Sequence, residues 1–158
     1  MKTTKVHCIG GIEFRFTKIP AIPARELLSG MEADFDVLRP FIEVSTSAGW
    51  IVLDSTATIE KHISSWETLT LAELYSYDYN YGFLTSWKPT PLPAKMEESS
   101  YRVAETKNVD AAVAALITNN MANYEQLRDS YSLEEAFKLL DVLTVKKINE
   151  FRAAEASK

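Results

Sequence analysis

Few residues of this chain could do chemistry, and the closest pair of reactive types is His7 and Cys8. A cysteine beside a histidine suggests a thiolate nucleophile activated by an imidazole base. The two residues lie in a segment that we predict to be a β-strand, and neighbouring strand residues point to opposite faces. The imidazole and the thiol would then not reach each other, so we do not expect a Cys–His nucleophile.

The other candidates for acid–base chemistry are His62 and three pairs of nearby carboxylates in polar stretches, where their pKa values would stay ordinary. The sequence contains no phosphate-binding glycine motif and no GxSxG motif. We therefore predict no catalytic, cofactor-binding or metal-binding residue and a protein that is not an enzyme. A small enzyme or regulator whose site is assembled only by the fold remains an alternative. The carboxylate pairs are Asp34 and Asp36, Glu97 and Glu98, and Glu134 and Glu135.

Composition narrows the partners and the compartment. The 158 residues carry a net charge of −5 with a pI of about 5.1, and no cluster of lysine and arginine offers a surface for phosphate backbones or anionic lipid. The single cysteine permits no disulfide within the chain and no thiolate cluster for zinc. No apolar stretch approaches the roughly 20 residues that span a bilayer. We expect a cytoplasmic protein that binds neither nucleic acid nor membrane.

The N-terminal segment predicts a β-hairpin from about residue 5 to 18. Apolar and polar residues alternate from Ile12 to Thr17, which is the period of a half-buried strand. Gly10 and Gly11 stand where a two-residue turn with positive φ is needed. The hairpin should pack on a helical body, and the fold class that we predict is α+β, predominantly helical.

Helices are predicted for most of the chain between the hairpin and residue 87. Pro23 fits the first turn of a short helix that ends near Gly30. Residues 32–50 place apolar side chains on one helical stripe, although Pro40 should kink that helix or split it.

Two more helices should complete this body, and the core should lie mainly in residues 1–86. The first would be capped by Thr56 or Thr58, and the second would run from Thr70 to about Tyr81. The apolar face of the first is made by Ile59, Ile63 and Trp66.

A proline-rich stretch separates this body from the C-terminal region. Alternating prolines favour an extended conformation, and we expect no helix in this linker. The predicted domains are a hairpin plus helical core domain at 1–87, the linker at 88–100, and a helical C-terminal region at 101–158.

The C-terminal region predicts an alanine-rich helix from about Val109, ended by two asparagines, and a second helix that starts after Ser132 with a capping box. The second helix is either continuous or divided at Thr144, and both readings leave an apolar seam that needs a partner. The seam consists of Leu133, Phe137, Leu140, Thr144, Ile148 and Phe151.

Two sets of apolar residues are candidates for a protein interface. The first belongs to the aromatic run of residues 74–87, because tyrosine and tryptophan are enriched at binding hot spots. The second belongs to the C-terminal seam, whose pattern is typical of a helix that docks in a groove. The alternative for each set is that it packs on its own chain. The candidates are Tyr77, Tyr79, Tyr81, Trp87, Leu133, Phe137, Leu140, Ile148 and Phe151.

The layout resembles the tail assembly chaperones and related small morphogenesis proteins of tailed bacteriophages. The resemblance is carried by the glycine-turn strand that leads into "FRFTKIPAIPARELL", by the helical middle that ends in "NYGFL", and by the terminal "YSLEEAFKLLDVLTVKKINEFRAAE". It extends over most of the chain and rests on layout and local pattern.

The resemblance implies a non-enzymatic protein of the host bacterial cytoplasm. Such a protein binds the tape-measure protein, keeps it soluble and helps to recruit tail-tube subunits; self-association is a further option for the apolar seam. A structural baseplate or tail-completion component is the alternative, and the two differ in whether the protein stays in the finished virion.

Overall fold

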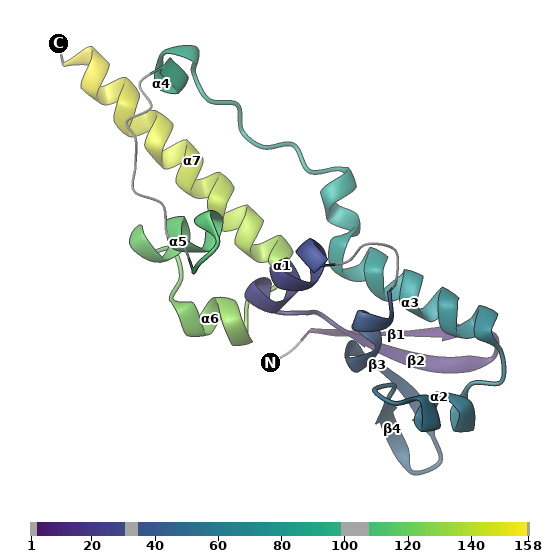
Figure 1. The fold of residues 1–158 in the computed structure, drawn as a ribbon. Helices are drawn as coiled ribbons and strands as arrows, with labels where there is room; N and C mark the ends of the chain where they lie inside the picture. The colour runs from purple at the N-terminus through teal and green to yellow at the C-terminus, as the bar shows by residue number, and fades with distance from the viewer. Residues whose placement is uncertain (1–2, 31–34, 99–107, 158) are drawn as a thin grey trace.

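A computed structural model describes residues 3–30, 35–98 and 108–157 of the chain, and Figure 1 shows how its elements are arranged. A four-stranded antiparallel sheet formed by the N-terminal part packs against helices, so the predicted α+β, predominantly helical class is confirmed. In chain order the elements are β1 (Thr4–Ile9), β2 (Ile12–Thr17), α1 (Ala21–Gly30), the 3-10 helix η1 (Asp36–Phe41), β3 (Ile42–Thr46), β4 (Gly49–Val52), α2 (Thr56–His62), α3 (Trp66–Tyr81), the 3-10 helix η2 (Gly82–Thr85), α4 (Ala94–Glu98), α5 (Ala111–Thr118), α6 (Tyr124–Asp129) and α7 (Leu133–Ala156).

The predicted hairpin is present as β1 and β2. Gly10 and Gly11 have φ of 58° and 81°, the left-handed values that a two-residue hairpin turn requires. The register pairs His7 with Phe14, and Phe14 and Phe16 are buried on the face that packs against helices. The opposite face carries polar residues, as is usual for an antiparallel sheet with one solvated side.

The prediction of a helix over residues 32–50 is wrong. Of this range, the described part forms η1 and then the hairpin β3–β4, which extends the sheet in the order β1-β2-β3-β4. Pro40 lies inside the short η1, and the β-branched residues that follow favour a strand. Ile42 and Val44 pair with Phe16 and Phe14 of β2 and are buried beside them, so their apolar spacing is that of a strand.

The caps of the middle helices lie earlier than predicted. Ser55 caps α2 and accepts the Thr58 amide, while Ser65 caps α3 and accepts the Glu67 amide. The helix α3 ends at Tyr81, as expected. It lies along the sheet, whereas α7 extends from the same junction to the far end of the molecule (Figure 1).

The C-terminal helices also begin at polar caps. Asp110 caps the start of α5. The helix ends at the asparagine pair, as predicted, and Asn120 has a left-handed φ of 56°. Ser132 and Glu135 form the predicted capping box of α7, which is one continuous helix through Thr144. The short helix α6, capped by Asn123, was not predicted.

The linker differs from its predicted form at one point, because residues 94–98 form the short helix α4 after the last proline. Residues 99–100 of the linker, and the part of the C-terminal region at 101–107, lie outside the described residues. The described chain offers no direct test of the three domain limits, which remain predictions. None of the described helices is long and apolar enough to cross a membrane.

Three clusters of buried residues hold the described fold together, and only the first is confined to the region where we expected the main core. It lies between the sheet, α2 and α3. The second joins α1 to α5, α6 and α7, and the third joins α1, η1 and α3 to the start of α7. The C-terminal region therefore packs on residues 1–86 through α1 and α3. The third cluster contains Ile19, Ala24, Leu38, Tyr81 and Leu133.

Candidate functional site

His7 and Cys8 lie on opposite faces of β1, as the strand geometry predicts. The His7 ring stacks on Tyr75 of α3, with centroids 4.5 Å apart and an angle of 4° between the planes. Cys8 is exposed on the other face. The imidazole and the thiol thus have different neighbours, and the pair does not form a catalytic unit.

Two of the acidic candidates, Glu134 and Glu135, have structural roles at the start of α7. Glu135 accepts the amide and hydroxyl of Ser132 in the capping box. A hydrogen bond from Lys138 holds the pKa of the Glu134 carboxyl below its ordinary value. Within residues 3–30, 35–98 and 108–157, no three side chains of His, Cys, Asp or Glu are placed to share a metal ion. Asp34 and the side chains of Glu97 and Glu98 lie outside the described structure.

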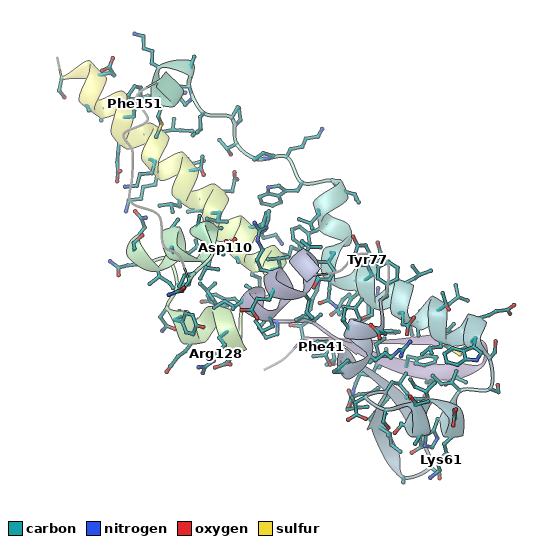
Figure 2. The ribbon with its side chains drawn as sticks, in the orientation of Figure 1. Phe41, Lys61, Tyr77, Asp110, Arg128 and Phe151 are labelled. Carbon is teal, nitrogen blue, oxygen red and sulfur yellow. The ribbon has the colours of Figure 1, made fainter. Side chains whose placement is uncertain are left out.

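Two interface candidates on α3, Tyr77 and Tyr81, contact other residues of the same chain. Tyr81 is buried, its hydroxyl donates to the Ala24 carbonyl at 2.9 Å, and burial raises its pKa to about 12. Tyr77 packs between Tyr81 and Phe35, with ring centroids 5.3 Å and 5.0 Å away (Figure 2). Of these two candidates, only the half-buried Tyr77 retains surface for a partner.

Tyr79 lies beside a surface groove of about 630 Å³ between the start of β1, α3 and the start of α7. The Lys18 ammonium stands 4.5 Å from the centroid of the Tyr79 ring and 3.5 Å from Glu134. Lys5 stands over Tyr75 in the same groove, and the hydrogen bond with Tyr75 raises the pKa of Lys5. In this groove Lys18 thus pairs with Glu134, and Lys5 lies against Tyr75.

Candidates from the two predicted interface sets meet each other in an aromatic cluster. Phe137 of α7 contacts Phe83 of η2 and Trp87, with centroids 5.5 Å and 5.4 Å away and rings nearly perpendicular. These edge-to-face contacts are a favourable aromatic arrangement. The cluster fixes the start of α7 to the end of α3.

The remaining seam residues also lie largely against the chain itself. Leu133 and Ile148 are buried, and Leu140 is half-buried beside the second cluster. Phe151 is half-buried near the end of α7 that lies farthest from the sheet (Figure 2). Leu133, Phe137 and Leu140 thus pack on other residues of their own chain, which was the alternative to a partner interface.

Large apolar side chains are exposed at positions that the sequence prediction missed. Trp66, predicted on the buried face of a helix, is 68% exposed at the start of α3. It borders a hollow of about 110 Å³ whose other lining residues are Ile59, Ile63 and Leu69, which are apolar, and Glu60, Ser64 and Ser65, which are polar. Helical periodicity could not show the exposure of Trp66, because α2 ends at His62 and Trp66 begins the next helix, α3.

Comparisons with known proteins give no relative for this chain: no family model, no curated protein and no solved structure matches it.

Proposed function

We propose that this protein acts by binding another protein and not by catalysis, and that its client docks at Trp66. Following the resemblance described above, the client is the tape-measure protein of a tailed bacteriophage. The protein is then a tail assembly chaperone of the host bacterial cytoplasm that also helps to recruit tail-tube subunits.

The exposure of Trp66 is the observation that carries this proposal. Leaving a tryptophan ring in water is costly, and tryptophan is the residue type most enriched at binding hot spots. The neighbouring hollow has the buried residues Ile59, Ile63 and Leu69 on one side and Glu60, Ser64 and Ser65 on its polar rim, so a client side chain with an apolar part could fill it beside the indole. An exposed aromatic side chain next to a partly apolar hollow suits a helix of another protein.

Replacement of Trp66 by alanine tests the client site. We expect the Trp66→Ala variant to bind a co-expressed tape-measure fragment about 30-fold more weakly, because truncation of a hot spot costs roughly 2 kcal/mol or more. The affinity is measured with purified proteins by titration calorimetry. The melting temperature should change little, since Trp66 has only a minor part in the core.

The matched control is Leu92→Ala, which removes an exposed apolar side chain far from the hollow in sequence and should leave the affinity unchanged. Equal affinity of the wild type and of Trp66→Ala would show that the client binds elsewhere. No binding of the wild type to any tape-measure fragment would remove the proposed client.

A further inference from the structure

The strand β1 forms an open edge of the sheet. The strand order β1-β2-β3-β4 gives β1 a single neighbour, and the side chains of residues 4–8 are all exposed. Many edge strands are blocked by a proline, a bulge or a covering element. β1 contains no proline, and its register with β2 runs without a bulge. The outer side of β1 can therefore accept a further strand.

The alternation of hydrogen bonds shows which backbone groups of β1 are free. The Lys18 amide donates to the Thr3 carbonyl at 2.8 Å, and the two-residue turn places Ile9 opposite Ile12. In an antiparallel pair every second residue bonds to the partner strand, so the odd-numbered residues of β1 bond to β2. The amide and carbonyl groups of the even-numbered residues point outward, away from the sheet. These residues are Thr4, Val6 and Cys8.

The side chains of Lys5 and His7 lie on the face of β1 that packs against α3. Each stands opposite a phenylalanine of β2 that is buried on that face, and the His7 ring stacks on Tyr75. A strand added to β1 would place every second side chain on the same face, in line with these two. The groove of about 630 Å³ beside Lys5 leaves room for such a side chain.

The charges in the groove favour an acidic side chain opposite Lys5. Two lysines and two carboxylates line the groove, and Lys18 pairs with Glu134. Within the described part of the chain, the Lys5 ammonium forms no salt bridge with Asp78 or another carboxylate and lies over the Tyr75 ring instead. The residue of an added strand directly opposite Lys5 would have its Cβ about 5 Å from that of Lys5, close enough for an ion pair.

The edge strands of a second copy of this chain do not supply that acid. If two β1 strands paired in the register that satisfies all three outward residues, Val6 would oppose Val6, and Lys5 of one copy would oppose His7 of the other. β4, the other edge strand, has four residues and no charged side chain. The edge of β1 thus fits a strand of a different protein better than a strand edge of its own kind.

We propose that the edge of β1 binds an extended segment of another protein, which pairs antiparallel to β1 and carries an acidic side chain opposite Lys5. In this mode of recognition the main-chain hydrogen bonds provide affinity and alternate side chains provide specificity. The residue opposite Val6, which is 50% exposed, should be apolar. The inference goes beyond the proposed client site, since it uses neither Trp66 nor the hollow beside it.

Two fluorescein-labelled peptides test the proposal with the full chain. The acidic peptide is Ser-Thr-Tyr-Val-Glu-Thr-Ser with blocked ends, and the basic peptide has lysine in place of glutamate. In anisotropy titrations at low salt we expect saturable binding of the acidic peptide and about tenfold weaker binding of the basic one. Lys5→Glu should reverse this preference. The matched control is Lys61→Glu, which changes the net charge equally at an exposed lysine of α2 and should leave the preference unchanged.

Methylation of single peptide amides tests the strand pairing itself. The amide of the peptide valine would donate to the Val6 carbonyl, whereas the amide of the peptide glutamate would point away from β1. We expect N-methylation of the valine to weaken binding about tenfold, and N-methylation of the glutamate to change it little. Bound peptide should also slow amide exchange at the three outward residues of β1, while the amides of Lys5 and His7 are protected with or without it.

Other outcomes would overturn the proposal. No binding of the acidic peptide at about 1 mM would leave the edge without the proposed partner. An unchanged preference in Lys5→Glu would show that Lys5 does not select the acid, and equal effects of the two methylations would place the peptide elsewhere. A wild type that dimerises in sedimentation velocity, with the dimer lost in Val6→Pro, would assign the edge to a second copy. Trp66→Ala should bind the acidic peptide as the wild type does, so this test and that of the client site fail separately.

Discussion

The sheet region and the C-terminal helical region are built on different principles. In the first cluster all the fully enclosed side chains except Ala72 are large, including Phe14, Phe16, Leu53 and Leu69. In the second cluster three of the six buried residues are alanines, and more of the surrounding apolar side chains are only partly buried. Burial of large apolar side chains contributes the most free energy per residue, so the sheet region has the stronger core.

The helices of the two regions depend on their surroundings to different degrees. Helices α5 and α6 have eight and six residues, which is too short for stability in isolation. They are held by packing on α1 and α7, and the backbone bond from the Ala21 amide to the Tyr131 carbonyl, 2.7 Å long, ties the two regions together. The difference suggests that the C-terminal helices open before the sheet does.

The largest effect should come from a cavity in the stronger core. Phe14 is fully buried between the sheet and the helices, and we expect Phe14→Ala to lower the free energy of unfolding by about 3–5 kcal/mol. A loss of this size is a large fraction of the stability of a single domain. Chemical denaturation followed by circular dichroism measures it.

Leu116→Ala is the matched change in the second cluster, where Leu116 is equally enclosed. We expect it to speed amide exchange in α5 and α6 while the amides of β2 stay protected, because the C-terminal helices can open locally. Equal acceleration of exchange in β2 would show that the two regions unfold as one unit, and the comparison would then fail.

The sequence predicted those parts of the fold that depend on interactions between residues close together in the chain. The Gly10–Gly11 turn and the alternation after it specify the first hairpin, and the Ser132 capping box specifies the start of α7. The hairpin β3–β4 was missed because β3 is stabilised by pairing with β2, 28 residues away in the case of Arg15 and Glu43. An i, i+3, i+4 pattern over a β-branched segment cannot show that contact.

The candidate site was less predictable than the fold. Periodicity identifies which residues share a face of a helix, but it does not identify which neighbour covers that face. Phe137 and Trp87 were candidates for contact with a partner protein, with packing on their own chain as the alternative, and they contact each other. Trp66 was predicted in a core, and the break before α3 leaves it exposed. Exposure is decided by tertiary packing, which one sequence alone does not reveal.

A smaller effect should arise where the two regions meet. The Tyr81 hydroxyl donates to the Ala24 carbonyl of α1, and its loss in Tyr81→Phe should cost about 1 kcal/mol, since the buried carbonyl loses a partner. Burial raises the pKa of Tyr81 from 10.0 to about 12. The stabilisation that comes with the neutral phenol is therefore fully present below pH 10, and this contribution, roughly 3 kcal/mol, is lost as the pH rises through about 12.

Denaturation of both proteins at a series of alkaline pH values separates Tyr81 from the other groups that titrate there. The wild type should lose more stability than Tyr81→Phe above pH 10, so the two curves should approach each other and then cross. Parallel curves would show that Tyr81 ionises freely and that the contact between α1 and α3 opens at little cost.

The smallest effects are expected at two buried serines, one in each region, that differ in their hydrogen-bond partners. Ser76 lies within α3, and Ser132 is the N-cap of α7. Ser76 of α3 is fully buried, and its hydroxyl makes no hydrogen bond to any residue that the structure describes. Ser132 caps α7 and accepts the Glu135 amide. Ser76→Ala removes an uncompensated polar group and adds the best helix former, so we expect a gain of up to about 1 kcal/mol. Ser132→Ala removes a cap and should cost about 1 kcal/mol. Thermal and chemical denaturation should thus give a higher melting temperature and free energy of unfolding than the wild type for Ser76→Ala and lower values for Ser132→Ala. A loss of stability in Ser76→Ala would show that the Ser76 hydroxyl has a hydrogen-bond partner.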